Sequence, residues 1–181
     1  MDDTIKTLRS REIYRNRWMV LHEDDLRFPG GYEGIYGWVK KPHFVVVVPL
    51  FADGTVELVR VFRYPLGRAL WEFPQGAWET VENADPREVA HGELREETGL
   101  RAARLEKTAD MHAAYGFVDH PFTVFLATDL TRGVPQREAT ELAMTSARFT
   151  IAQVIQMITD GQITDAQTIA ALGHLKLIGR I

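Results

Sequence analysis

A continuous apolar run from Phe44 to Ala52 constrains the fold of this chain more than any other segment. It contains four valines in succession, Val45 to Val48. β-branched side chains favour strands, and a strand that is apolar on both sides needs cover on both faces. The run has nine residues and includes Pro49, whereas a membrane-spanning helix needs about 20 apolar residues. It therefore predicts a buried strand at the centre of a sheet.

Shorter patterns on either side predict the remaining elements. The segments 18–21 and 26–28, followed by a Pro-Gly-Gly turn at 29–31 and the segment 35–39, resemble a pair of antiparallel strands. The last thirty residues or so change to helical spacing. We expect a single α+β domain whose mixed sheet is flanked by helices, with residues 1–42 as an N-terminal strand region and residues 43–181 as the main body. Further strands are expected at 56–62, 124–127 and 147–149, and helices around 154–158 and 169–176.

Composition excludes several classes of function. The 181 residues carry 21 Lys and Arg against 25 Asp and Glu, a net charge of −4, and have no basic run of the kind that binds nucleic acid. With no cysteine, the chain has no disulfide, thiolate nucleophile or cysteine-bound metal. The N-terminus starts acidic and lacks the apolar core of a signal peptide. We therefore expect a cytoplasmic protein that binds neither nucleic acid nor membrane.

One predicted helix carries charges that work against its own stability. Asp85 and Pro86 are typical of a helix start, and Gly99 is typical of a helix end, which predicts a helix that begins at Pro86 and stops at Gly99. It carries Glu93, Glu96 and Glu97 within one turn, opposite an apolar side of Val89, Ala90 and Leu94. Each like-charged pair at this spacing costs roughly 0.2–0.5 kcal/mol. Glu96 and Glu97 also lie at the negative end of the helix dipole, where anions are disfavoured.

Two interpretations of these glutamates are open. They can form a solvated acidic face; Arg95, two residues from Glu93 and one from Glu96, is spaced to point elsewhere. Alternatively, three converging carboxylates suit a hard divalent cation, Mg²⁺ or Mn²⁺, that keeps several waters for a substrate phosphate.

The residues before the helix favour the second interpretation. The Nudix signature reads G-x5-E-x7-R-E-U-x-E-E-x-G-U, where U is a bulky aliphatic residue. This chain has Gly76, five residues, Glu82, nine residues, and then Gly-Glu-Leu-Arg-Glu-Glu-Thr-Gly-Leu from Gly92 to Leu100. It resembles the Nudix hydrolases, with two extra loop residues and with Gly92 in place of the arginine that in this family orients the glutamates. The resemblance implies a Nudix-type α/β/α sandwich with a mixed central sheet and an N-terminal antiparallel strand subdomain.

Outside the signature, the segments 46–50, 60–65 and 71–74 are similar to the ADP-ribose pyrophosphatase branch of that family. This resemblance implies Glu93 and Glu97 as the main metal ligands, with Glu96 alongside and the carbonyl of Gln75 contributing. It also implies roles in substrate binding for a further set of residues: Arg63 and Glu72 at the diphosphate and ribose, and the N-terminal aromatics Trp38, Tyr36 and Phe28 at the adenine. Each has a plainer alternative, a solvated strand residue for Arg63, a core strand and turn for Glu72, and core or dimer packing for the aromatics.

The resemblance further implies a general base in the acidic loop after the strand at 124–127, and a homodimer in which a partner subunit completes the adenine site. Glu141 is the first candidate base and Glu138 the second, unless both are merely exposed loop acids; Glu93 acting as the base is the third option. The expected reaction is the metal-dependent hydrolysis of a nucleoside diphosphate derivative. ADP-ribose is the first candidate substrate, and another nucleotide sugar, NADH or a dinucleoside polyphosphate is the alternative. The alternative is not an enzyme but a Nudix module that binds and senses a nucleotide. It is suggested by Gly92, whose departure from the signature would signal lost catalysis.

Overall fold

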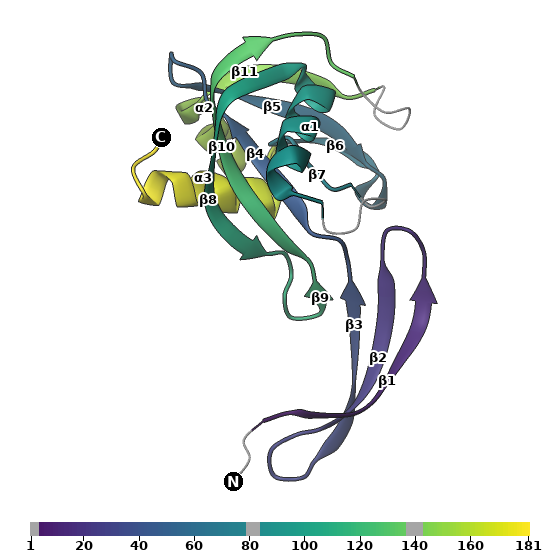
Figure 1. Cartoon of the computed structure of the whole chain (residues 1–181). Helices are drawn as coiled ribbons and strands as arrows, with labels where there is room; N and C mark the ends of the chain where they lie inside the picture. The colour runs from purple at the N-terminus through teal and green to yellow at the C-terminus, as the bar shows by residue number, and fades with distance from the viewer. Residues whose placement is uncertain (1–3, 79–83, 137–142) are drawn as a thin grey trace.

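The computed structural model describes residues 4–78, 84–136 and 143–181 (Figure 1). The elements in chain order are β1 (Lys6–Arg15), β2 (Val20–Arg27), β3 (Glu33–Lys40), β4 (Phe44–Pro49), β5 (Thr55–Arg63), a 3-10 turn (Tyr64–Leu66), β6 (Arg68–Glu72), β7 (Gln75–Gly76), α1 (Pro86–Thr98), β8 (Leu100–His112), β9 (Val118–Asp119), β10 (Pro121–Arg132), β11 (Thr145–Thr150), α2 (Ile151–Thr159) and α3 (Ala166–Leu177).

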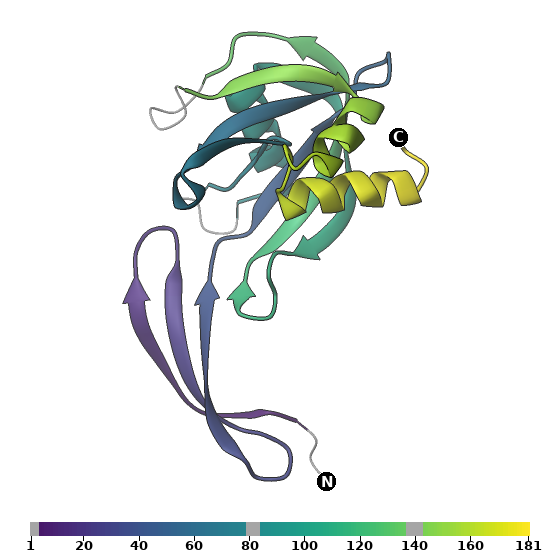
Figure 2. The same ribbon diagram turned by 180° about the vertical axis from the view of Figure 1, so that it is seen from behind.

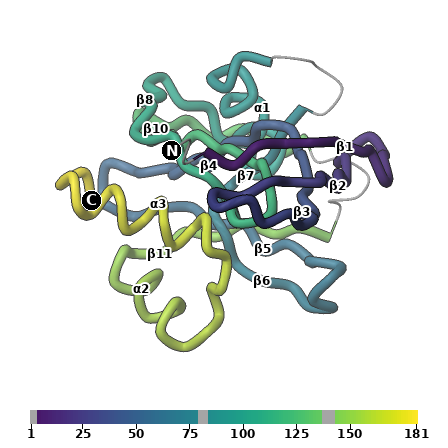
Figure 3. The backbone as a smooth tube through the Cα atoms, turned by 90° about the horizontal axis from the view of Figure 1, so that it is seen from below, coloured from purple at the N-terminus to yellow at the C-terminus, as the bar shows by residue number. Residues whose placement is uncertain are grey.

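The apolar run forms β4, at the centre of a mixed sheet with the strand order β7-β4-β10-β8. β4 pairs parallel with β10 and antiparallel with β7. Alternate side chains of β4 enter two different cores, as the period of a strand requires. Val45 and Val47 pack with residues of α1, while Val46 and Val48 pack with residues of α2 and α3. Both faces are therefore covered, as predicted, and the view from below places α1 and the α2–α3 pair on opposite sides of β4 (Figure 3).

A second sheet has the order β11-β5-β6, and it corrects one detail of the sequence prediction. β4 and β5 follow each other through a turn at Asp53 and Gly54, but they belong to different sheets and meet only at a single bridge, Leu50 to Val56. Val56 and Leu58 are fully buried in the same core as Val46 and Val48. The turn thus folds the chain from one sheet onto another.

The N-terminal strands form a third sheet, in the order β1-β2-β3-β9, that projects away from the main body (Figures 1 and 2). β2 and β3 are antiparallel, as predicted, and β9 joins β3 in parallel through the pairs Val39–Val118 and Lys40–Asp119. No helix in the described part of the chain is long and apolar enough to cross a membrane.

Candidate active site

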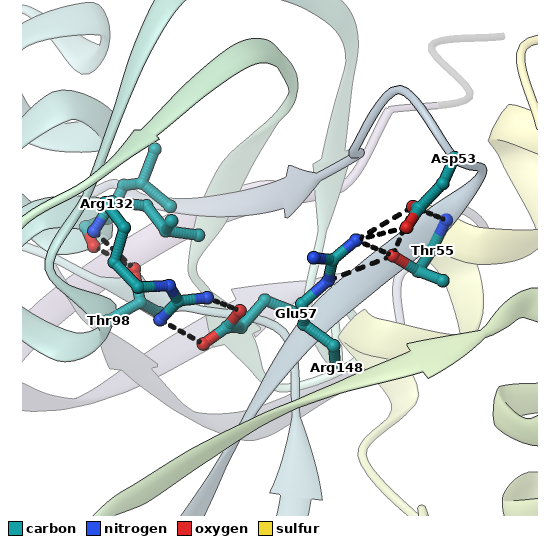
Figure 4. Close-up of polar contacts among 8 residues, drawn as sticks. Asp53, Thr55, Glu57, Thr98, Arg132 and Arg148 are labelled. Atoms are coloured by element: carbon teal, nitrogen blue, oxygen red, sulfur yellow. Dashed lines mark hydrogen bonds and ion pairs between the residues drawn. The ribbon is translucent and has the colours of Figure 1, made fainter.

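The helix α1 has the predicted start and end. The Asp85 carboxylate accepts a hydrogen bond from the Arg87 N–H at 2.9 Å, and Pro86 is the first helical residue. Gly99 takes the left-handed conformation, with φ of 75°, and donates to the Arg95 carbonyl at 2.9 Å. The buried Thr98 hydroxyl donates to the Leu94 carbonyl and accepts from the next strand, which fixes the helix end (Figure 4).

Glu93 and Glu97 are buried, with exposed fractions of 8% and 3%. A solvated acidic face is therefore the wrong interpretation for these two residues. The Gln75 N–H of β7 donates to Glu97 Oε2 at 3.2 Å. A Cβ atom added to Gly76 would lie 2.5–2.6 Å from the carboxyl atoms of Glu93. The two carboxylates, four residues apart on one helix face, thus lie directly against the backbone of β7.

Glu96 has a different environment from its neighbours. Its side chain is one-quarter exposed and accepts from Arg95 Nη2 at 3.1 Å, so the expectation that Arg95 points elsewhere is wrong. The Glu96 carbonyl accepts from the Gln136 N–H at 3.0 Å. Gly133 likewise donates to the Gly99 carbonyl at 2.8 Å. The segment 133–136 is thereby fixed on the helix end. The candidate bases Glu138 and Glu141 follow it and lie outside the described residues.

An ion pair with a buried carboxylate lies beside the segment 133–136. Glu57 of β5 is 1% exposed and accepts from both terminal nitrogens of Arg132, at 3.1 and 2.5 Å (Figure 4). Burying a lone carboxylate is costly, so the guanidinium at the end of β10 is required by the fold. Arg148 of β11 bonds Asp53 and Thr55 at the turn where β5 begins. The Glu57–Arg132 pair joins the β11-β5-β6 sheet to the end of β10, which continues into the segment 133–136 before Glu138 and Glu141.

Arg63 and Glu72 lie side by side on the paired strands β5 and β6. Two nitrogens of Arg63, Nε and Nη2, donate to the two carboxylate oxygens of Glu72, the first of them at 3.0 Å. Burial raises the pKa of Glu72, and Arg63 opposes that rise. Burial by itself lowers the pKa of Arg63, but the charge of Glu72, assisted by Asp165 and Glu97, outweighs it and raises that pKa above its ordinary value. Arg63 therefore stays charged, and the electrostatic effect of Glu97 on it links it to the carboxylates of α1.

A pocket of about 400 Å³ adjoins β7. Arg63, Gln75 and Gly76 line it, which brings the predicted cationic residue to the segment that contacts Glu93 and Glu97. Sequence reasoning missed several other lining residues, which come from distant parts of the chain: Trp18, Lys41, Pro42, Phe44, Ala77, His120, Asp165 and Gln167.

Three of these missed residues bear on the chemistry of the pocket. Burial, assisted by the charge of Lys41, lowers the pKa of His120 to about 4, so its imidazole is neutral near pH 7. Asp165 caps α3 by accepting from the Thr168 N–H at 2.8 Å, and it also accepts from Gln75 Nε2 at 3.4 Å. The pocket therefore combines two cationic side chains, Arg63 and Lys41, with a neutral imidazole and the Asp165 carboxylate at the start of α3.

The predicted aromatic residues lie elsewhere. Tyr36 and Trp38 of β3 line a second pocket of about 290 Å³, together with Tyr115 and Phe117. Trp38 stacks on His22 with ring centroids 4.4 Å apart, and its Nε1 donates to Asp24 at 2.8 Å. Phe28 packs against Tyr32, 5.8 Å between centroids. Among the described residues, the lining of the larger pocket includes none of the three predicted aromatics.

The oxygen donors near β7 fit a hard divalent cation. In residues 4–78, 84–136 and 143–181, no three His, Asp or Glu side chains form a ready metal cluster. Glu93 and Glu97 nevertheless present two buried carboxylates to the β7 backbone, and Gly76 has no side chain to fill the space beside them. Two carboxylates on one helix face suit a hard ion that retains several waters.

Comparison with known proteins agrees with this arrangement. A model described as the NUDIX domain matches residues 41–172, and one described as the nucleoside diphosphate sugar hydrolase N-terminal domain matches residues 5–39. An ADP-ribose pyrophosphatase of Mycobacterium tuberculosis is 33% identical over 170 residues, covering 92% of this chain and 81% of the relative. One from Bacillus subtilis is 31% identical over 173 residues, covering 95% and 92%.

Structural comparison supports the fold. A crystal structure titled ADP compounds hydrolase superposes with a TM-score of 0.84 at 21% identity, covering 98% of this chain and 97% of its own. This likeness confirms the expected Nudix-type architecture, mixed sheet and helices included. With the family model spanning most of the sequence and two relatives above 30% identity, the chain belongs to the Nudix family and is a Nudix pyrophosphohydrolase.

Proposed function

We propose that this enzyme hydrolyses ADP-ribose to AMP and ribose 5-phosphate with the help of a divalent cation, Mg²⁺ or Mn²⁺. The observation that carries this proposal is the position of the buried Glu93 and Glu97 carboxylates against β7, next to a pocket that Arg63 also lines. The two relatives named as ADP-ribose pyrophosphatases support the choice of substrate.

Glu93, Glu97 and the carbonyl of Gln75 would hold the cation, with Glu96 alongside. When bound, such an ion neutralises charge on the diphosphate and lowers the pKa of a coordinated water. The protein's own contribution is to hold the two carboxylates in place. The Gln75 N–H stabilises the charged form of Glu97, because a hydrogen bond to a carboxylate favours ionisation.

Arg63 and Lys41 would bind the diphosphate. The pairing of Arg63 with Glu72 uses Nε and Nη2, and among the described contacts Nη1 is the nitrogen left for a phosphate oxygen. Glu72 thereby holds the guanidinium of Arg63 in a fixed orientation. We propose that Glu72 also contacts the ribose of the substrate. An oriented guanidinium is effective because phosphoryl transfer depends on positioning and on charge stabilisation.

A general base must remove a proton from the attacking water. Glu141 is the first candidate and Glu138 the second, and Glu93 is the third if the water lies on the α1 side. The segment 133–136 supports Glu138 and Glu141 as candidates. Its backbone is hydrogen-bonded to the end of α1, and it precedes these two residues in the sequence.

The N-terminal region would complete the substrate site as part of a homodimer. In this proposal residues 1–42 form the dimer-side subdomain, and Trp38, Tyr36 and Phe28 contact the adenine in a pocket to which a partner subunit contributes. Two apolar side chains on this projecting sheet, Ile13 and Ile35, are exposed. Exposed apolar surface of this kind supports the proposal that a partner subunit covers this sheet in solution. Sedimentation tests the dimer, and cell fractionation tests the expected cytoplasmic location.

A substrate panel tests the reaction. ADP-ribose, another nucleotide sugar, NADH and a dinucleoside polyphosphate are offered with Mg²⁺ or Mn²⁺, and products are resolved by chromatography. Metal-dependent release of AMP from ADP-ribose, lost in Glu97→Gln, is the expected result. Faster turnover of another compound in the panel would make that compound the substrate in place of ADP-ribose. Binding of ADP-ribose without turnover of any compound would favour a nucleotide sensor.

A further inference from the structure

Gly92 occupies an unfavourable position in α1. It lies in the middle of the helix, and it is buried. Glycine is a poorer helix former than every residue except proline, because ordering its backbone loses the most entropy. A glycine in this position therefore needs a reason in the packing.

The indole of Trp78 supplies that reason. A Cβ atom added to Gly92 would lie 2.6 Å from Trp78 Cζ2 and 3.2 Å from Cε2. Real Cβ atoms essentially never approach another atom to within 3.0 Å, so the ring rests directly on the helix backbone at this residue. Trp78 also packs on the core between β4 and α1, which includes Val89 and Leu94. The ring is thus seated on the helix and packed against this core.

Trp78 is close in sequence to the backbone that meets the carboxylates. Gly76, two residues earlier, lies against Glu93, and the Gln75 N–H donates to Glu97 at 3.2 Å. Gly92 in turn precedes Glu93 on the helix. The chain therefore contacts α1 at three successive points, through the Gln75 N–H, through the bare Cα of Gly76 and through the Trp78 ring.

We propose that Trp78 is a positioning residue for the active site: its indole, seated on Gly92, sets the distance between β7 and the Glu93 and Glu97 carboxylates. Gly92 stands where the family signature has arginine, and the arginine's first side-chain atom would occupy the space that the indole fills. This enzyme therefore orients its carboxylates from the β7 side, by a rigid ring contact. The role in cation binding rests on the function proposed above, whereas the positioning of the β7 backbone does not.

The substitution Gly92→Ala separates positioning from helix stability. Alanine is the better helix former, so a helical glycine with no close neighbour would be replaced with a gain in stability. If the ring sets the position of β7, however, the new methyl group displaces the ring, and the ring displaces the Gln75 N–H from Glu97. In a Trp78→Phe background the clash is relieved, because a phenyl ring has no atom at the position of Cζ2.

Amide hydrogen exchange followed by NMR measures this directly on the whole chain without metal. Gly92→Ala should raise the exchange rate of the Gln75 amide by about tenfold while core amides of β4 and β10 keep their protection. In the Trp78→Phe background, Gly92→Ala should change the exchange rate of the Gln75 amide by less than about twofold. The two substitutions would then not be additive, which identifies a direct contact between residues 78 and 92. Gly173→Ala in α3 is the matched control, since an added Cβ there meets nothing within 4 Å.

Mn²⁺ titration by calorimetry on wild type, Gly92→Ala, Trp78→Phe and the double variant tests the consequence for the cation. Gly92→Ala should weaken binding by about tenfold in the wild-type background and by less than about twofold with Trp78→Phe. An unchanged Gln75 amide in Gly92→Ala, or an equal increase in both backgrounds, would overturn the positioning role. If the wild-type chain binds no Mn²⁺, the proposed cation is refuted, and the amide exchange still decides the role of Trp78.

Discussion

Replacing Gly76 by alanine should inactivate the enzyme without unfolding it. The added methyl carbon would lie 2.5 Å from the Glu93 carboxyl carbon, whereas ordinary contact begins at 3.4 Å. The carboxylate must therefore retreat by about 1 Å, and a displacement of that size at a reacting centre costs about 100-fold in rate. This loss corresponds to about 2.7 kcal/mol of transition-state stabilisation.

The free energy of unfolding should change much less. The atoms in the way are the far end of a flexible side chain, and Gly76 does not take the left-handed conformation. Alanine also reduces the entropy of the unfolded chain, so we expect a change below about 1 kcal/mol. The fold thus tolerates the methyl group at the expense of the position of Glu93.

Steady-state hydrolysis of ADP-ribose at saturating Mg²⁺, with a denaturant titration of each protein, measures both quantities. Gly173→Ala adds the same methyl group to a helix in open space and should keep full activity. A kcat of Gly76→Ala within about threefold of wild type would refute the reasoning, because any real displacement of the carboxylate costs far more than that in rate. A loss of activity matched by an equal loss of stability would refute it too.

Three further substitutions test other parts of the site. Glu97→Gln should lower kcat by about 1000-fold, because the amide oxygen still accepts from Gln75 but no longer carries charge, and its melting temperature should rise. Arg63→Ala leaves the buried Glu72 unpaired. In a denaturant titration at neutral pH this substitution should cost about 2 kcal/mol of stability. Burial raises the pKa of Glu72 above its ordinary value, so the folded state binds a proton on this carboxyl more readily than the unfolded state does. Mild acidification should therefore recover part of the lost stability. No recovery would mean that the buried charge of Glu72 is not the reason for the loss. His120 has its pKa lowered from 6.5 to about 4, so the unfolded state binds that proton more readily and stability falls as the pH drops through this interval. After allowance for partial exposure, wild type should lose about 1 kcal/mol between pH 7 and pH 5 from this group, and His120→Gln should show a smaller loss over the same interval.

The sequence predicted those parts of the fold that depend on local signals. Asp85, Pro86 and Gly99 each act within one turn of α1, so the helix bounds followed from residue type alone. β1 and β8 were not predicted. The side chains of β1 are mostly exposed, so it has no buried alternate face to reveal it, and β8 depends on its long pairing with β10. Their strand conformation comes from partners distant in the chain.

The candidate site divides in the same way. Glu93, Glu97 and Gln75 were found because the signature places them within one local unit, and the structure brings them together. Lys41 and His120 were missed, since each enters the pocket through a separate strand connection and has no neighbouring motif. The buried state of Glu93 and Glu97 was also open, because helical spacing alone does not distinguish a solvated acidic face from one covered by β7.

The charge pattern of α1 is best understood as a conflict between stability and chemistry. Two buried carboxylates four residues apart repel each other, and Glu97 lies beside the negative end of the helix dipole. The fold offsets this with the Gln75 N–H and with the charge of Arg63, both outside the helix. A sequence selected for stability alone would place a neutral side chain there, so a rise in melting temperature on Glu97→Gln, together with lost turnover, would identify function as the reason for the charge. A fall in melting temperature with turnover unchanged would instead mean that the carboxylate is held for structural reasons, and the cation site would have to be sought away from Glu97.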